Sequence, residues 1–194
     1  MFYQPDGKPF AVSKVHQFAA PKNRHHNMRV AFSGGGKTYG VAADGTTGYV
    51  WKAWVDGDAV RLRREDTNDD RVEFTAPSIT QIDLCFDQNM RPFFTYVSAG
   101  VAYYRYYDFD TDTYNAVSLR DSAIRFPRCV LDDPDPANAP KSDIILGYTR
   151  AGNLCYRIQR ERFLKEYIVA TDPKKTMLWR VGRTTDFRIG FQWR

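Results

Sequence analysis

Acidic side chains gather in three short clusters, and paired carboxylates are the first chemistry they suggest. A glycosidase needs two carboxyl groups roughly 5 to 10 Å apart across a cleft. Each cluster lies in a polar stretch typical of turns, where Asp accepts hydrogen bonds from backbone N–H groups. We therefore interpret the clusters as turns and not as catalytic pairs. They are Asp69-Asp70, Asp108-Asp110-Asp112 and Asp132-Asp133-Asp135.

Metal-ligating and nucleophilic residues form no recognisable motif. The carboxylates of the Asp108–Asp112 turn could bind Ca²⁺ through their oxygens, so this possibility stays open. The turn lacks the Gly and the terminal Glu of an EF-hand loop. The three cysteines are isolated, which indicates reduced, mostly buried thiols and neither a zinc site nor a disulfide framework. No serine lies in a G-x-S-x-G motif. We expect no enzyme activity, no resident metal and no cofactor. The His and Cys residues are His16, His25, His26, Cys85, Cys129 and Cys155.

A relaxed phosphate-loop pattern runs from Ala31 to Thr38. A phosphate loop must lead from a buried strand into a helix whose N-terminus faces the phosphates. Here Gly40, Asp44-Gly45 and Gly48 follow within ten residues of Thr38, which favours hairpins over a helix. We interpret the glycines as a turn between strands and do not expect nucleotide hydrolysis.

Basic residues slightly outnumber acidic ones, with 28 Lys and Arg against 23 Asp and Glu and a net charge of +5. Most charges alternate in sign along the chain, so we do not expect a nucleic-acid partner. One local basic arm is a candidate contact for a partner surface. It consists of Lys22, Arg24, His25, His26 and Arg29.

Aromatic side chains make up 15% of the chain and could stack on sugars or pack against a partner. We identify Trp51, Tyr104, Tyr106, Arg105 and Arg157 as candidate partner or glycan contacts. Neighbouring residues of a strand point to opposite faces of the sheet, so one set of tyrosines must pack inward or against a partner. Because Arg105 and Arg157 each follow a strand tyrosine, we interpret both arginines as structural.

The element that must position these residues is a repeated hairpin. Pro92–Val97 and Val101–Tyr107 are aromatic and β-branched and flank a turn at Gly100. The same pattern recurs 52 residues later around Gly152, and a weaker copy lies 52 residues earlier at Gly48. Such a period suggests one supersecondary unit used three times. We predict that Gly100 and Gly152 occupy equivalent turns with positive φ, and we count Gly48 as a third structural turn.

The remaining periodic segments all have the two-residue period of strands. We therefore predict an all-β chain of antiparallel hairpins, forming a partial or open propeller-like fold or, alternatively, a β-sandwich. We divide a single domain, residues 1–194, into an N-terminal arm or edge segment (1–27), repeat units at about 28–75, 76–124 and 125–170, and C-terminal strands (176–194). The exposed edges of such units invite pairing with other chains. No apolar run near 18 residues occurs, so we expect no membrane span.

Three segments give the chain a resemblance to structural proteins of tailed bacteriophages and prophages. They are DQNMRPFFTYVSAGVAYYRYYD (87–108), SDIILGYTRAGNLCYRIQRERFLKEY (142–167) and the ending LWRVGRTTDFRIGFQWR (178–194). The resemblance covers about the last 115 residues and transfers no catalytic residue. It implies a component of the virion tail, neck or baseplate that is assembled in the host cytoplasm.

Two functions from different classes follow. In the first, the chain is a non-enzymatic virion structural protein, present as a homo-oligomer or in several copies on a ring with other virion proteins. In the alternative, it is a carbohydrate-binding module of a phage tail that recognises a glycan receptor. A sialidase-like hydrolase is a third class, for which we expect no turnover.

Overall fold

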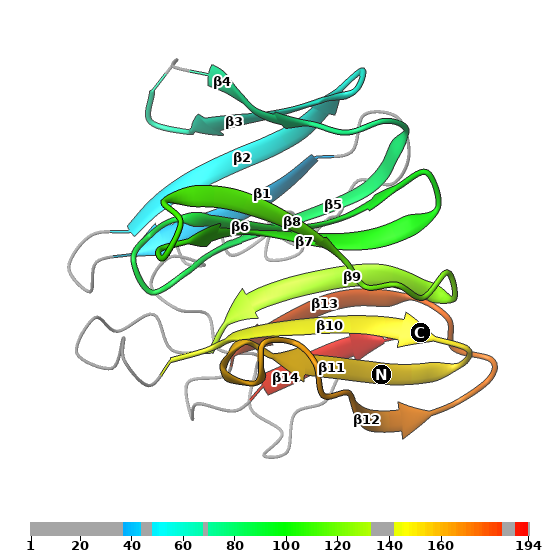
Figure 1. Cartoon of the computed structure of the whole chain (residues 1–194). Helices are drawn as coiled ribbons and strands as arrows, with labels where there is room; N and C mark the ends of the chain where they lie inside the picture. The colour runs from blue at the N-terminus through cyan, green and yellow to red at the C-terminus, as the bar shows by residue number, and fades with distance from the viewer. Residues whose placement is uncertain (1–36, 44–47, 68–69, 133–141, 184–188, 194) are drawn as a thin grey trace.

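The computed structural model describes residues 37–43, 48–67, 70–132, 142–183 and 189–193. These residues form four antiparallel sheets (Figure 1), so the prediction of an all-β chain is confirmed. The basic arm at Lys22–Arg29 lies outside the described residues.

Each sheet is a meander in which consecutive strands pair side by side. The first sheet holds β1 (Lys37–Ala43), β2 (Gly48–Asp56), β3 (Ala59–Arg64) and β4 (Asp70–Thr75). The second holds β5 (Ile79–Phe86), β6 (Pro92–Ser98), β7 (Val101–Asp108) and β8 (Thr113–Ser118). The third holds β9 (Ile124–Leu131), β10 (Ile144–Arg150), β11 (Asn153–Ile158) and β12 (Tyr167–Thr171), with a 3₁₀ turn, η4 (Gln159–Glu161), before β12. The fourth holds β13 (Leu178–Arg183) and β14 (Ile189–Trp193).

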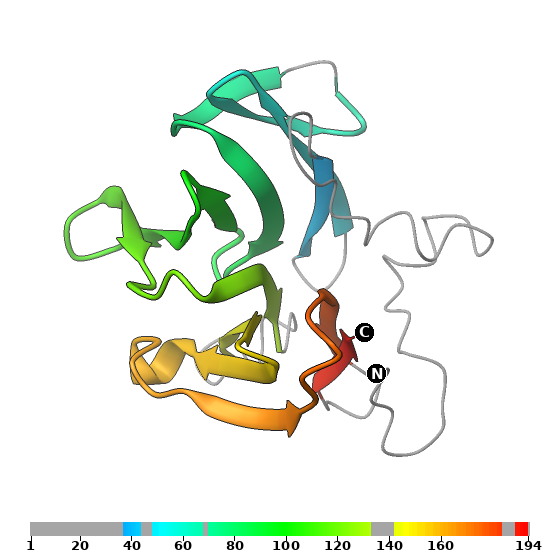
Figure 2. The same cartoon turned by 90° about the vertical axis from the view of Figure 1, so that its right-hand side faces the viewer.

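The first strand of each sheet packs against the first strand of the next. β1 contacts β5, β5 contacts β9, and β9 contacts β13. Figure 2 shows the sheets following one another around this line of first strands. Within the described ranges, no packing of similar extent joins β13 to β1. The arrangement is that of an open, propeller-like fold.

Apolar residues on both faces of the inner strands explain why the sheets stack face to face. β6 is buried along its whole length because both of its faces are covered. Phe94 packs with Leu62 in the cluster between the first and second sheets, while Phe93 packs with Leu146 in the cluster between the second and third. Full burial of a Phe or Leu side chain contributes about 1.5–3 kcal/mol. A third cluster, between the third and fourth sheets, includes Leu154 and Phe191.

The repeated hairpin has the geometry that its sequence predicts. β6 pairs antiparallel with β7, and β10 pairs antiparallel with β11. Gly100 has φ 80° and Gly152 has φ 78°, and the preceding Ala99 and Ala151 have φ 47° and 49°. Positive φ at both central residues is what a two-residue type I′ turn requires.

The prediction that Gly48 is the third copy of this turn is wrong. Gly48 is the first residue of β2 and pairs with Ala43, so it belongs to the first hairpin of its sheet and not to the second. The equivalent β2–β3 turn contains Gly57, with φ 61°. The period is not constant because the connection from β9 to β10 is longer than that from β5 to β6. Thr38, at the end of the phosphate-loop-like pattern, lies in a strand, β1, and not at the start of a helix. This agrees with the expectation that the pattern is not a phosphate loop.

Candidate functional site

The tyrosines proposed as contacts are largely used by the core. Tyr104 is buried, stacks on Phe93 with ring centroids 5.9 Å apart, and lies 4.7 Å from the ring of Phe163. The ring of Tyr106 lies 5.9 Å from that of Tyr104 and packs against the same cluster. Tyr104 therefore presents no open aromatic face to a sugar, and the set that contains Tyr104 and Tyr106 is the one that packs inward.

Arg105 joins the second sheet to the first. Its guanidinium lies over the rings of Phe74 and Tyr114, at 5.1 and 4.2 Å, and donates to the carbonyl of Glu73 at 3.4 Å. Burial lowers the pKa of Arg105, and the charge of Glu73 opposes this effect. These contacts make Arg105 a structural link between sheets.

Arg157 occupies the equivalent position on β11 and holds the loop that follows this strand. It donates from Nε to the Tyr148 hydroxyl at 2.7 Å and from Nη1 to the Phe163 carbonyl at 3.1 Å. Because Phe163 contacts Tyr104, the structure brings Tyr104, Tyr106 and Arg157 together between the second and third sheets.

Trp51 lies apart from that group, in the first sheet. Its ring packs 5.8 Å from Phe86, and the Arg71 guanidinium lies 5.7 Å from its centroid. Trp51 also lines a cavity of about 200 Å³ together with Leu62, Arg64, Thr67 and Arg71. Trp51 is thus a predicted aromatic contact that lines a cavity.

The acidic turn at Asp108 supports its own hairpin. Asp108 accepts hydrogen bonds from the Asp110 N–H at 3.0 Å and from the Asn115 amide at 3.1 Å, and Asp112 accepts one from the Tyr107 hydroxyl. Within the described ranges no three His, Cys, Asp or Glu side chains are grouped as metal ligands. The three cysteines are buried and free, as their isolated positions predict.

Four buried or inward polar residues, which the sequence analysis did not identify, meet at the first strands. They are Thr38 on β1, Asp83 on β5, Arg128 on β9 and Arg180 on β13. The Asp83 carboxylate accepts from the Thr38 hydroxyl at 2.9 Å and from the Cys129 N–H at 3.0 Å. Burial raises the pKa of Asp83, although Arg128 opposes this, and burial lowers the pKa of Arg128 to about 10 and of Arg180 to about 9. Asp83 thus joins three of the four sheets near the centre of the fold.

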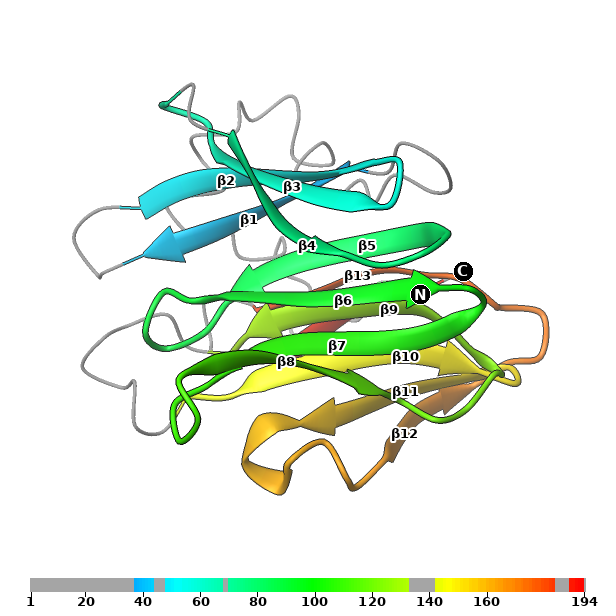
Figure 3. The same ribbon diagram turned by 45° about the horizontal axis from the view of Figure 1, so that its top comes forward.

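The most exposed apolar surface lies at the edge of the third sheet. β12 is the outermost strand there (Figure 3). Ile168 is 59% exposed, Val169 is 39% exposed, and Leu164 in the preceding loop is 80% exposed. We call these three residues and β12 the β12 edge. Its position was not predicted, because the sequence of residues 161–170 does not reveal which strand ends a sheet.

The outer strands of the other two four-stranded sheets differ from β12. β4 carries Asp70, Arg71 and Glu73, and charges on an edge strand discourage pairing with another chain. β8 exposes Thr113 and Ala116 but no large apolar side chain. β12, YIVAT, carries no charge and exposes two large apolar side chains, Ile168 and Val169. Neither β4 nor β8 combines these two properties, which favour pairing with another strand.

The loop before β12 is firmly anchored. Arg162 and Phe163 both have positive φ, 53° and 56°, a conformation that costs non-glycine residues about 1–3 kcal/mol each. Burial of the Phe163 ring against Phe93 and Tyr104 offsets this cost. Leu164, the next residue, therefore remains exposed on a segment whose backbone is fixed.

Glu166 secures the other end of this loop. It accepts a hydrogen bond from the Tyr148 hydroxyl at 2.5 Å and forms ion pairs with Arg150 and Arg157. Burial, reinforced by Glu166, raises the pKa of Tyr148. The loop that carries Leu164 is therefore held by Phe163 on one side and Glu166 on the other.

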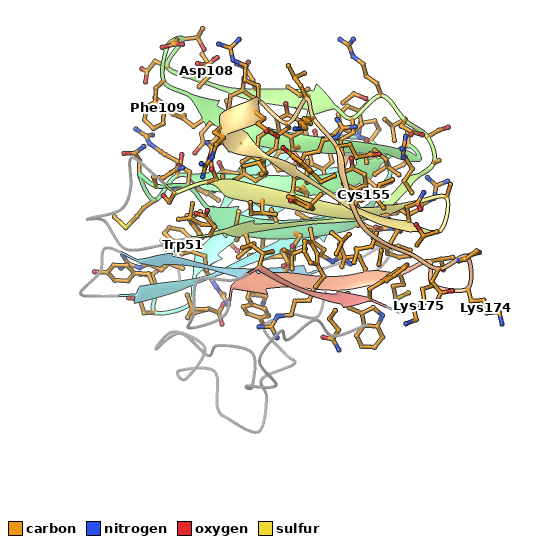
Figure 4. All side chains as sticks on the ribbon, turned by 90° about the horizontal axis from the view of Figure 1, so that it is seen from below. Trp51, Asp108, Phe109, Cys155, Lys174 and Lys175 are labelled. Atoms are coloured by element: carbon orange, nitrogen blue, oxygen red, sulfur yellow. The ribbon has the colours of Figure 1, made fainter. Side chains whose placement is uncertain are left out.

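Three exposed basic residues precede or follow β12 in the chain. Arg162, Lys165 and Lys174 are exposed, and none forms an ion pair with a described carboxylate. The Lys165 ammonium lies 4.6 Å from the ring of Tyr167. Figure 4 shows Lys174 and Lys175 at the periphery of the molecule, far from Trp51. A partner of this edge meets an apolar strand with basic flanks.

No family model, curated protein or solved structure matches the chain. The part of the chain that the structure describes contains no helix able to cross a membrane.

Proposed function

We propose that the chain is a non-enzymatic structural component of a bacteriophage virion, in the tail, neck or baseplate, and that it docks onto other virion proteins through the β12 edge. The observation that carries the docking proposal is an uncharged outer strand with exposed Ile168 and Val169, beside an anchored loop that exposes Leu164. The virion assignment rests on the resemblance of residues 87–108, 142–167 and 178–194. The protein would be assembled in the host cytoplasm in several copies around a symmetric axis.

An extended strand of the partner is the occupant that fits this edge. Strand addition supplies main-chain hydrogen bonds to the free N–H and C=O groups of an outer strand, and alternate side chains supply specificity. Exposed Ile168, Val169 and Leu164 favour apolar side chains in the added strand. Arg162, Lys165 and Lys174 favour acidic residues at its flanks, which would speed association and fix its register.

The roles of the candidate contact residues support a structural protein over an enzyme. Tyr104, Arg105 and Arg157 are occupied with joining sheets or holding the loop. Asp108 and Asp112 hold their turn. These residues stabilise the body that presents the β12 edge.

The docking proposal is tested by producing the chain together with the proteins encoded beside its gene. We expect one of these proteins to form a complex with it, measured by size-exclusion chromatography with light scattering, and we expect purified particles to contain the chain. Ile168→Asp should abolish the complex, because it places a charge on β12 where the apolar side chains of the added strand would pack. Phe109→Asp is the matched control, because Phe109 is 56% exposed in the turn between β7 and β8 of a different sheet.

Two results would overturn the proposal. If Ile168→Asp and Phe109→Asp bind the partner equally well, the β12 edge is not the docking surface. If no neighbouring protein binds and particles lack the chain, the virion assignment is wrong.

A further inference from the structure

The cavity beside Trp51 has the composition of a small binding site. Trp51 and Leu62 supply apolar surface, and Arg64, Thr67 and Arg71 supply polar groups. Its volume of about 200 Å³ suits a single small ring. The cavity belongs to the first sheet, so it is separate from the β12 edge on the third.

The guanidinium groups of both arginines in this cavity are held in place through their Nε atoms. Arg64 donates from Nε to Asp66 at 2.6 Å, and its guanidinium lies 4.8 Å from the ring of Tyr49. Arg71 donates from Nε to Glu73 at 3.0 Å and lies over the Trp51 ring. In the described part of the chain, the Nη1 and Nη2 groups of both arginines have no hydrogen-bond partner. Each guanidinium is therefore oriented by its Nε contact while its outer pair of donors stays available.

Paired guanidinium donors recognise planar oxyanions such as carboxylates, which accept two parallel hydrogen bonds. The aromatic face of Trp51 provides a flat apolar surface on which the C–H face of a sugar ring can lie. The Thr67 hydroxyl donates to the Arg64 carbonyl at 3.1 Å and can still accept a hydrogen bond from a sugar hydroxyl. The cavity lining contains no carboxylate, and the nearby Asp66 and Glu73 contact the Nε side of Arg64 and Arg71.

We propose that this cavity binds an acidic monosaccharide unit, with its carboxylate on Arg64 and Arg71 and its ring against Trp51. This inference goes beyond docking through β12 and does not depend on it. Of the candidate glycan contacts in the sequence, the inference retains Trp51 and excludes Tyr104, which is buried. Inorganic phosphate shares the charge of such a ligand but cannot use the Trp51 face.

The test is a titration of the full chain with glucuronic acid, followed through the tryptophan indole signals in ¹⁵N–¹H NMR spectra. Glucose, acetate and inorganic phosphate are titrated in parallel. We expect saturable shifts with glucuronic acid and at least ten-fold weaker binding of the other three compounds. Arg64→Gln and Arg71→Gln should each weaken glucuronic acid binding about ten-fold or more, because each removes a charged pair of donors to the carboxylate.

Arg91→Gln is the matched control, because the Arg91 guanidinium also lies over an aromatic ring, that of Tyr107 at 4.0 Å, but outside the cavity. It should bind glucuronic acid like the unchanged chain. Backbone amide spectra establish that each variant is folded. The proposal is overturned if glucuronic acid causes no saturable shift, if phosphate or acetate binds as tightly, or if Arg64→Gln and Arg71→Gln bind like Arg91→Gln. Failure here leaves docking through β12 untouched, because that is measured with a protein partner.

Discussion

Gly100 and Gly152 occupy equivalent turns, yet alanine at the two positions should have different costs. At Gly100, with φ 80°, an added Cβ would meet nothing within 4 Å, so Gly100→Ala costs only the left-handed backbone, about 1–2 kcal/mol. At Gly152, with φ 78°, the Cβ would lie 2.9 Å from the Cα of Pro173. A backbone atom cannot rotate away, so Gly152→Ala adds an overpacking cost of about 1–3 kcal/mol.

Urea unfolding at constant pH measures both costs. We expect both variants to lose stability without a change of m value, and Gly152→Ala to be less stable than Gly100→Ala by about 1–3 kcal/mol. Equal losses, or a larger loss for Gly100→Ala, would refute the close approach of Pro173 to this turn. No loss at Gly100 would refute the left-handed backbone there.

Three further predictions concern the turns, the loop before β12 and a buried thiol. Ala99→Asn and Ala151→Asn should each raise the free energy of unfolding by about 0.5–1 kcal/mol, because Asn-Gly suits the two positive φ values of a type I′ turn; a lower melting temperature would contradict this. Glu166→Gln should cost about 1–3 kcal/mol and speed proteolysis within residues 159–166, whereas unchanged cleavage there would show that Glu166 does not hold the loop. Burial, reinforced by Glu166, raises the pKa of Cys155 from 9.0 to about 11, so the unfolded thiol ionises first and stability should fall as pH rises through this range. Cys155→Ala should lose part of that pH dependence, as followed by urea unfolding at several pH values, and an identical pH profile would exclude the raised pKa.

The strands and the repeated turns could be predicted because they depend on local properties. Segments such as Ile79–Phe86 alternate apolar and polar residues, and this alternation identifies a strand with one face in the core. The turns at Gly100 and Gly152 could be predicted because each lies between two segments rich in aromatic and β-branched residues. A constant residue spacing misplaces the third copy at Gly48, because connection lengths between strands vary without disturbing the sheets.

The candidate site was less accessible to sequence reasoning because it depends on contacts between distant residues. Nothing local distinguishes Phe163, which inserts between two sheets, from Leu164, which is 80% exposed. Asp83 was visible as a polar residue between Ile82 and Leu84, but its partners come from β1 and β9. Whether a strand such as β12 is central or outermost follows from the order of pairing, which the sequence does not contain.

Hydrogen exchange at β12 tests the docking proposal most directly. Exchange of the Tyr167–Thr171 amides is measured in the chain alone and in its complex with the protein encoded beside it, with Thr113–Ser118 of β8 as the internal reference. We predict that the β12 amides that do not bond to β11 become protected in the complex while β8 is unchanged. Unchanged exchange at β12 in a complex that forms, or protection confined to another strand, would contradict docking through this edge.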